Sequence, residues 1–168
     1  KIVQPAELDR CGIIRVMKVF IENEAGSNQK NLYNEKTLEY KKTVTVSREY
    51  PYPYGFILDT TSGDGDNLDC FIITNKELQS GKIYDCEPVG LMEQTETSWD
   101  PDKKEVEEQD HNILASLKGE SAEINNSVKE KLINFASHVF DHIEGKVVKV
   151  GKFLGKEEAL KEVKSSLD

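Results

Sequence analysis

The chain has 168 residues, a length that fits one domain, so we expect a single domain over residues 1–168. Its 31 aspartate and glutamate residues outnumber 22 lysine and arginine residues, which gives a formal net charge of −9 at pH 7. This acidic balance argues against contact with nucleic acid, whose phosphates would be repelled, and it suits a site that collects divalent cations. Because no apolar run approaches about 18 residues, we expect no transmembrane segment.

The three cysteines, Cys11, Cys70 and Cys86, form no CxxC pair, and their number is odd. This pattern supports neither a zinc ribbon nor a disulfide framework. Cys70 lies in an apolar run and is interpreted as a buried free thiol. Free thiols are typical of a reducing compartment, so we expect an intracellular protein, in the cytoplasm or in an organelle matrix such as that of the mitochondrion. The sequence leaves open a segment upstream of Lys1.

The first half of the chain predicts short strands joined by turns. Alternating or β-branched residues indicate strands at 13–22, 43–46, 55–58 and 68–73. Residues 25–29 have the glycine, serine and asparagine content of a turn. Pro51 and Pro53 force their neighbours into extended backbone, so the segment between the second and third strands cannot be a helix.

The second half changes from strands to helices. Short strands are expected at 89–92 and 113–117, and the segment 93–110 between them has eight acidic residues and two lysines, which is typical of a solvated or mobile loop. Helical spacing of apolar residues predicts an amphipathic helix that stops near Gly145 and is carried by Ile124, Val128, Leu132, Phe135, Val139 and Ile143. A last helix is expected at 156–167. Strands followed by helices favour an α+β fold dominated by β.

Three carboxylates stand close together in the sequence, at Asp64, Asp66 and Asp69. At about 5 Å apart in a half-buried setting, each pair repels by roughly 1–3 kcal/mol, and a bound cation relieves that repulsion. Because the ligands would all be oxygens, we expect Mg²⁺, with Mn²⁺ as a second choice. The alternative is an ordinary acidic hairpin turn, since Asp-Gly is a common turn pair. An EF-hand is excluded because its final glutamate would fall at Asn75.

The acidic cluster belongs to a longer motif. Tyr54-Gly55-Phe56-Ile57 followed by Asp64-Gly65-Asp66-Asn67-Leu68-Asp69 resembles the signature of the family I soluble inorganic pyrophosphatases. Further matches to that family are Ile21-Glu22, Gly26-Ser27, Lys30, Pro88-Val89-Gly90 and Gly145-Lys146. Together they cover residues 13–167, nearly the whole chain. The resemblance implies a small closed OB-like five-stranded barrel flanked by about two C-terminal helices.

The resemblance also implies an activity and a set of roles. In that family several Mg²⁺ ions bridge carboxylates and pyrophosphate, lower the pKa of a bound water and neutralise phosphoryl charge during in-line attack. Carried over by position, Asp64 and Asp69 become metal ligands, and Asp66 becomes the general base. The positions that correspond to the family's substrate- and phosphate-binding residues are Glu22, Lys30, Lys42 and Tyr54. Lys42 stands where the family has an arginine, whose rigid fork it lacks.

The segment 93–110 departs from the family pattern, which has two aspartates and a lysine ahead of an Ile-Leu-Ala strand. The preferred alignment makes Glu105 and Asp110 metal ligands, puts Asn112 in place of the lysine and treats 93–110 as an acidic inserted loop. An alternative alignment, which keeps the lysine but breaks the apolar strand that follows, uses Glu96, Asp102 and Lys104.

Three other positions also lack the polar residue of the family. Leu32 replaces an acidic residue, while Val139 and Phe140 replace a tyrosine–lysine pair. Each lost charge-stabilising donor typically costs about 10²–10³ in rate. We therefore expect an inorganic-pyrophosphatase-like protein with weak or lost hydrolysis, serving as a scaffold or as a subunit of a homo-oligomer or larger complex. The alternative is an active Mg²⁺-dependent inorganic diphosphatase that converts pyrophosphate into two phosphates.

Overall fold

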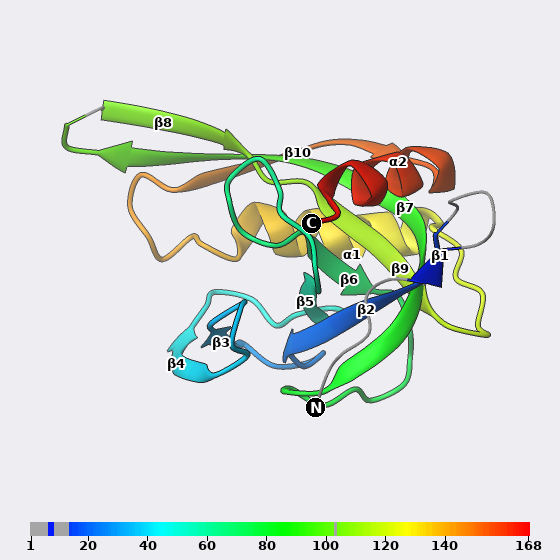
Figure 1. Cartoon of the computed structure of the whole chain (residues 1–168). Coiled ribbons are helices and arrows are strands. Elements are labelled where there is room, and N and C mark those ends of the chain that lie inside the picture. Colours follow the sequence, from blue (N-terminus) through cyan, green and yellow to red (C-terminus); the bar gives the residue numbers. More distant parts are fainter. Residues whose placement is uncertain (1–6, 9–13, 103) are drawn as a thin grey trace.

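The computed structural model describes residues 7–8, 14–102 and 104–168 (Figure 1). The elements are β1 (Glu7–Leu8), β2 (Ile14–Asn23), β3 (Gln29–Tyr33), β4 (Tyr40–Thr45), β5 (Tyr54–Ile57), β6 (Asp69–Ile72), β7 (Ile83–Asp100), β8 (Lys104–Gln109), β9 (Asn112–Leu117), α1 (Asn126–His138), β10 (Val147–Leu154) and α2 (Lys156–Ser166). Cys70 and Cys86 are buried free thiols, as expected for Cys70, and Cys11 lies outside the described residues. Within the described ranges, neither helix is long and apolar enough to cross a membrane.

Five strands close into a ring. β2 pairs with β5, β5 with β6, β6 with β9 and β9 with β7, and β7 returns to pair with β2. All of these pairings are antiparallel except β6–β9, which is parallel. β10 lies along β7, and β3 and β4 form a separate two-stranded sheet. The expected fold, a β-dominated α+β domain with a closed OB-like ring of five strands and two helices in its described part, is confirmed.

The acidic segment 93–110 forms a β-hairpin, which corrects the loop expected from its composition. β7 continues as far as Asp100, and β8 returns antiparallel beside it. The β-branched Thr95 and Thr97 fit the half-buried pleated surface of a strand, and β10 pairs with the same stretch of β7 on its other edge. Figure 1 shows the β7–β8 hairpin extending well beyond the ring.

Helix α1 is shorter than its apolar spacing predicts, since it ends at His138 and not near Ile143. Asn125 caps its start by accepting a hydrogen bond from the amide three residues on, at 3.0 Å. At the other end, the Ser47 amide donates to the Val139 carbonyl at 3.0 Å, an oxygen that a continuing helix would have used itself. The two residues after α1 therefore belong to a turn.

Two clusters of buried side chains fill the fold. One joins the ring to α2, where Ala159 and Val163 pack in the same cluster as strand residues such as Met17. The other joins the ring to α1 through Leu132 and Phe135. Tyr54 and Phe140 are partly buried against this second cluster, so the second core supports the residues of the site described below.

Gly55 allows β5 to approach β2 closely. A Cβ atom at this position would lie 1.7 Å from the Phe20 carbonyl oxygen, so no larger residue fits without moving the strand. The close approach fixes the position of the adjacent Tyr54, which points toward the site.

Candidate active site

A cavity of about 330 Å³ lies where the ring meets the β3–β4 sheet and the turn after α1. Carboxylates dominate its wall, and they belong to Glu22, Glu35, Asp64, Asp66, Asp69, Glu96, Glu108 and Asp110. Within the described part of the chain, the cations on the wall are Lys30 and Lys146. Of the residues selected from the sequence, the cavity brings together Glu22, Lys30, Tyr54, Asp64, Asp66, Asp69 and Asp110.

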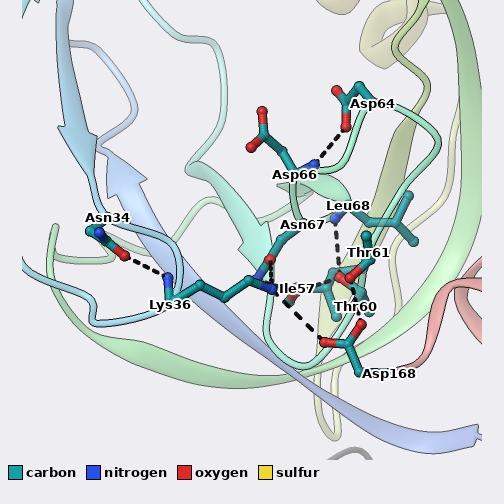
Figure 2. A network of polar contacts seen from close by, with 10 residues as sticks. All are labelled: Asn34, Lys36, Ile57, Thr60, Thr61, Asp64, Asp66, Asn67, Leu68 and Asp168. Atoms are coloured by element: carbon teal, nitrogen blue, oxygen red, sulfur yellow. Dashed lines mark hydrogen bonds and ion pairs between the residues drawn. The ribbon is translucent and has the colours of Figure 1, made fainter.

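The loop between β5 and β6 presents Asp64 and Asp66 (Figure 2). The Asp66 amide donates to Asp64 Oδ1 at 2.9 Å, and Gly65 between them has a φ of +89°, which glycine adopts without strain. At the base of the loop, the Leu68 amide donates to Thr60 Oγ1 at 3.0 Å. Figure 2 shows the carboxylates of Asp64 and Asp66 on the side of the loop opposite to Thr60. The backbone of the loop is thus held with both carboxylates on the cavity wall, where the Asp66 side chain also hydrogen-bonds with Glu35.

A second set of contacts ties this loop to the rest of the molecule. Asn67 Nδ2 donates to the Ile57 carbonyl at 3.2 Å, and Lys36 Nζ donates to Asn67 Oδ1 at 3.3 Å. Lys36 Nζ also lies 4.0 Å from an Asp168 carboxylate oxygen, and Thr61 Oγ1 donates to the same carboxylate (Figure 2). The exposed ion pair contributes little energy. The buried Asn67 amide is the stronger restraint, because a broken bond there would leave a buried polar group unpaired.

Asp69 and Asp110 form a hydrogen-bonded carboxyl pair in the cavity. Removal from water, followed by the negative charge of Asp110, raises the pKa of Asp69 well above its usual range. Burial also raises the pKa of Asp110, although the hydrogen bond from Asp69 opposes this. The pair therefore keeps a proton that two separate aspartates would release. Asp69 and Asp110 would hold a cation in their ionised form, so cation binding would release that proton.

Glu22 and Glu35 complete the acidic wall. Burial is the largest cause that raises the pKa of Glu22 to about 8, and the charge of Glu35 adds to it. Burial and the neighbouring Asp66 raise the pKa of Glu35 to about 7. Sequence reasoning missed Glu35, whose only signal is its place on the turn after β3, three residues beyond Leu32.

Tyr54 faces the same cavity from β5. Burial, followed by the charges of Asp69 and Asp110, raises the pKa of Tyr54 well above its ordinary value. The phenol therefore keeps its proton, and its hydroxyl can donate a hydrogen bond to an anionic ligand.

The structure does not bring Glu105 to the cavity, which corrects its expected position beside Asp110. Glu105 is exposed on β8 and pairs with Trp99 across the β7–β8 hairpin. Glu96, which belonged to the alternative alignment, lines the cavity instead, while Asp102 and Lys104 do not. The reason is the hairpin itself: it carries the residues near its tip away from the ring and leaves those near its base, Glu96 and Asp110, at the cavity.

Lys42 is likewise exposed on β4 and does not line the cavity. The second lysine of the cavity is Lys146, whose Nζ lies 2.9 Å from a Glu96 carboxylate oxygen. Lys146 belongs to the Gly145-Lys146 pair that matches the family, but the sequence pattern predicted no role for its side chain.

The four positions that are expected to depart from the family pattern all line the cavity, and they are Leu32, Asn112, Val139 and Phe140. Asn112 is only 2% exposed, and its Nδ2 donates to Gln94 Oε1 at 3.0 Å. Its Oδ1 has no hydrogen-bond partner among the described residues. This buried oxygen is an acceptor without a donor, on the same wall as the carboxyl pair.

The donor set of the cavity fits Mg²⁺. Among the described residues, no three acidic, histidine or cysteine side chains stand close enough to hold one ion by themselves. Mg²⁺ in proteins is usually held by one or two carboxylates together with waters and substrate phosphates, so pairs of carboxylates suffice. The Asp69–Asp110 pair and the unpaired Asn112 oxygen would supply oxygen ligands for the ion.

Known proteins resemble this chain over most of its length. The family model described as inorganic pyrophosphatase matches residues 19–168. The inorganic pyrophosphatase of Nanoarchaeum equitans is 35% identical over 151 residues, which cover 88% of this chain and 92% of that protein. That of Sulfolobus acidocaldarius is 30% identical and covers 80% of each chain.

Solved structures show the same likeness. The inorganic pyrophosphatase of Neisseria gonorrhoeae has a TM-score of 0.78 at 26% identity, over 99% of this chain and 95% of that chain. The Thermus thermophilus enzyme also has a TM-score of 0.78, at 24% identity over 97% and 94% of the two chains. The chain therefore belongs to the inorganic pyrophosphatase family.

Proposed function

We propose that this chain hydrolyses inorganic pyrophosphate to two phosphates in a Mg²⁺-dependent reaction, more slowly than a relative that keeps the full phosphate-binding wall. The observation that supports this most is the gathering of Asp64, Asp66, Asp69 and Asp110 on one cavity. Bound Mg²⁺ would supply charge neutralisation of the phosphoryl oxygens and acidify the attacking water.

Asp66 is the proposed general base. Its carboxylate is exposed on the cavity side of a loop whose backbone is fixed at 2.9 Å to Asp64. In the proposed reaction the water oxygen bonds to one phosphorus, the bridging P–O bond breaks, and Asp66 accepts the proton that the water loses. Lys30 and Lys146 would hold phosphate oxygens, and the protonated Tyr54 would donate to one of them.

The reduced rate follows from the neutral part of the wall. Leu32, Val139 and Phe140 supply no charge or hydrogen-bond donor from their side chains. Donors aimed at developing charge are typically worth about 10²–10³ each in rate, although such losses are not additive. We therefore propose a turnover roughly 10²-fold below that of a relative with the complete wall.

A second candidate function is a non-catalytic subunit of a homo-oligomer or larger complex, with the fold kept as a scaffold. The observation that favours it is the same neutral wall, which leaves two lysines against many carboxylates. The two candidates differ in one measurable respect, which is phosphate release from pyrophosphate.

The test is phosphate release from pyrophosphate with Mg²⁺, measured for the wild-type chain, Asp66→Asn and Asp59→Asn. Asp59 is an exposed residue outside the cavity, and its φ of +58° is one that asparagine adopts readily, so it is a matched control in the same loop. We expect turnover in the wild type, a loss of about 10²-fold or more in Asp66→Asn and no change in Asp59→Asn.

Two results would change this proposal. Wild-type turnover within about tenfold of a relative that keeps the full phosphate-binding wall would show that the neutral wall costs little. Absence of turnover in a protein that folds with Mg²⁺ present would favour the scaffold function instead.

A further inference from the structure

Phe140 carries two lysine side chains on its ring. Lys146 Nζ lies 3.9 Å from the ring centroid and Lys30 Nζ lies 4.9 Å from it, and both distances are within the range of cation–π attraction. Lys30 comes from β3 and Lys146 directly precedes β10, so the ring joins two segments far apart in the sequence. All three residues line the active-site cavity.

The ring attracts the ammonium groups without cancelling their charge. Lys146 also pairs with Glu96 at 2.9 Å, and the charge of Lys30 acts on Glu22 and Asp110. Without the ring, these carboxylates alone would set where each ammonium group lies. A carboxylate neutralises its lysine, whereas an aromatic ring is uncharged and leaves N–H donors available to an anion.

We propose that Phe140 is a positioning residue that holds Lys30 and Lys146 together as a clamp for the phosphate oxygens of pyrophosphate. The identity of the anion rests on the proposed function. From the sequence alone, Phe140 is interpreted as the loss of a phosphate-binding group, because an apolar side chain replaces a polar one. The geometry assigns it a compensating role: the ring carries no charge of its own but gathers two cations that the fold delivers from elsewhere.

The direct test is binding of imidodiphosphate, a non-hydrolysable pyrophosphate analogue, measured by titration calorimetry in Mg²⁺ buffer. Phe140→Leu keeps the apolar bulk and removes the ring, while Phe140→Tyr keeps the ring. Since two cation–π contacts are lost, we expect roughly tenfold weaker binding in Phe140→Leu and binding within about twofold of wild type in Phe140→Tyr.

Phe153→Leu is the matched control. Phe153 packs against the same core cluster as Phe140 and also carries a lysine, with Lys129 Nζ 5.6 Å from its ring, but it lies outside the cavity. We expect it to leave imidodiphosphate binding unchanged. In steady-state assays Phe140→Leu should raise KM for pyrophosphate about tenfold with kcat within about threefold, whereas a merely structural defect would lower kcat at constant KM.

A double variant tests whether the ring acts through a lysine. If it does, adding Phe140→Leu to Lys146→Met should weaken binding by clearly less than the tenfold seen in the wild-type background, because one of the two contacts is already gone. Equal binding by wild type and Phe140→Leu would overturn the clamp while leaving hydrolysis in place. Binding of the analogue without any turnover of pyrophosphate would overturn the proposed function, and the clamp would still be judged from the Phe140 variants.

Discussion

Removing divalent cations and raising the pH should destabilise the protein, because buried carboxyl groups of the cavity then ionise without a bound cation to offset their charge. The pKa of Glu22 is raised from 4.5 to about 8, mainly by burial. The folded chain therefore keeps a proton that the unfolded chain releases above pH 4.5, so the free energy of unfolding falls as the pH rises through this interval. Between pH 6 and pH 8, Glu22 alone accounts for about 2 kcal/mol of that fall.

Thermal melting followed by circular dichroism measures the effect. For a chain of this size, about 2 kcal/mol corresponds to a Tm lower by roughly 4–8 °C at pH 8 than at pH 6 in EDTA. The Asp69–Asp110 pair acts in the same direction, since the pKa of each is raised. Adding Mg²⁺ at pH 8 should restore the Tm, because a cation that binds only the folded chain stabilises it.

Two variants distinguish the effect of the cavity carboxyl groups on the pH dependence from the effect of the net charge of the molecule. Glu22→Gln should remove about 2 kcal/mol of the pH dependence between pH 6 and pH 8. Glu39→Gln changes the formal charge equally at an exposed position outside the cavity and should leave the dependence intact. A Tm in EDTA that stays constant from pH 6 to pH 8, or an unaltered pH dependence in Glu22→Gln, would refute the reasoning.

Three further predictions concern the fold and the acidic wall. Gly55→Ala should lower stability to urea by about 3 kcal/mol or more, because its Cβ would overlap the Phe20 carbonyl oxygen; a smaller loss would mean that β5 moves easily. Asn125→Ala should cost about 1 kcal/mol in the same assay through loss of the α1 cap, and no loss would show that the cap is dispensable. Glu35→Gln should weaken Mg²⁺ binding, measured by calorimetry, several-fold. Adding Leu32→Glu to that variant should restore binding, because both positions line one cavity. A failed recovery would show that the carboxylate must come from residue 35.

Local sequence patterns predict the parts of the site that short-range geometry fixes, and the family resemblance supplied more distant residues such as Glu22 and Asp110. Asp64, Asp66 and Asp69 fall within six residues, so a turn followed by a strand must bring them together. The order of strands and helices was also predictable, since alternation and helical spacing are local patterns. What these patterns cannot show is how far an element continues. The contact between Ser47 and Val139, which ends α1, joins residues remote in the sequence.

The β7–β8 hairpin is a second feature that local sequence patterns could not predict, and it affects the site itself. Composition predicted a loop at 93–110, and a loop can be aligned in several ways. Once β7 and β8 are paired, their register determines which residues lie near the cavity. Glu96 pairs with Glu108 near the base, and Glu105 pairs with Trp99 near the tip. Cross-strand pairing depends on the partner strand, so neither alignment could place all of these residues.

The charge of the cavity links its neutral wall residues to its many carboxyl groups. Eight carboxyl groups and two lysines line the described wall. Even with the raised-pKa groups protonated, the remaining carboxylates would repel free pyrophosphate. A ligand that enters must bring cations, or find them already held by the carboxylates. At the positions of Asn112 and Phe140 we expect lysines in relatives that neutralise phosphate. In this chain the two lysines on the Phe140 ring, together with Mg²⁺ when bound, would supply that share of the neutralisation. Any turnover should therefore depend on Mg²⁺ concentration more steeply than in a relative that keeps the lysines.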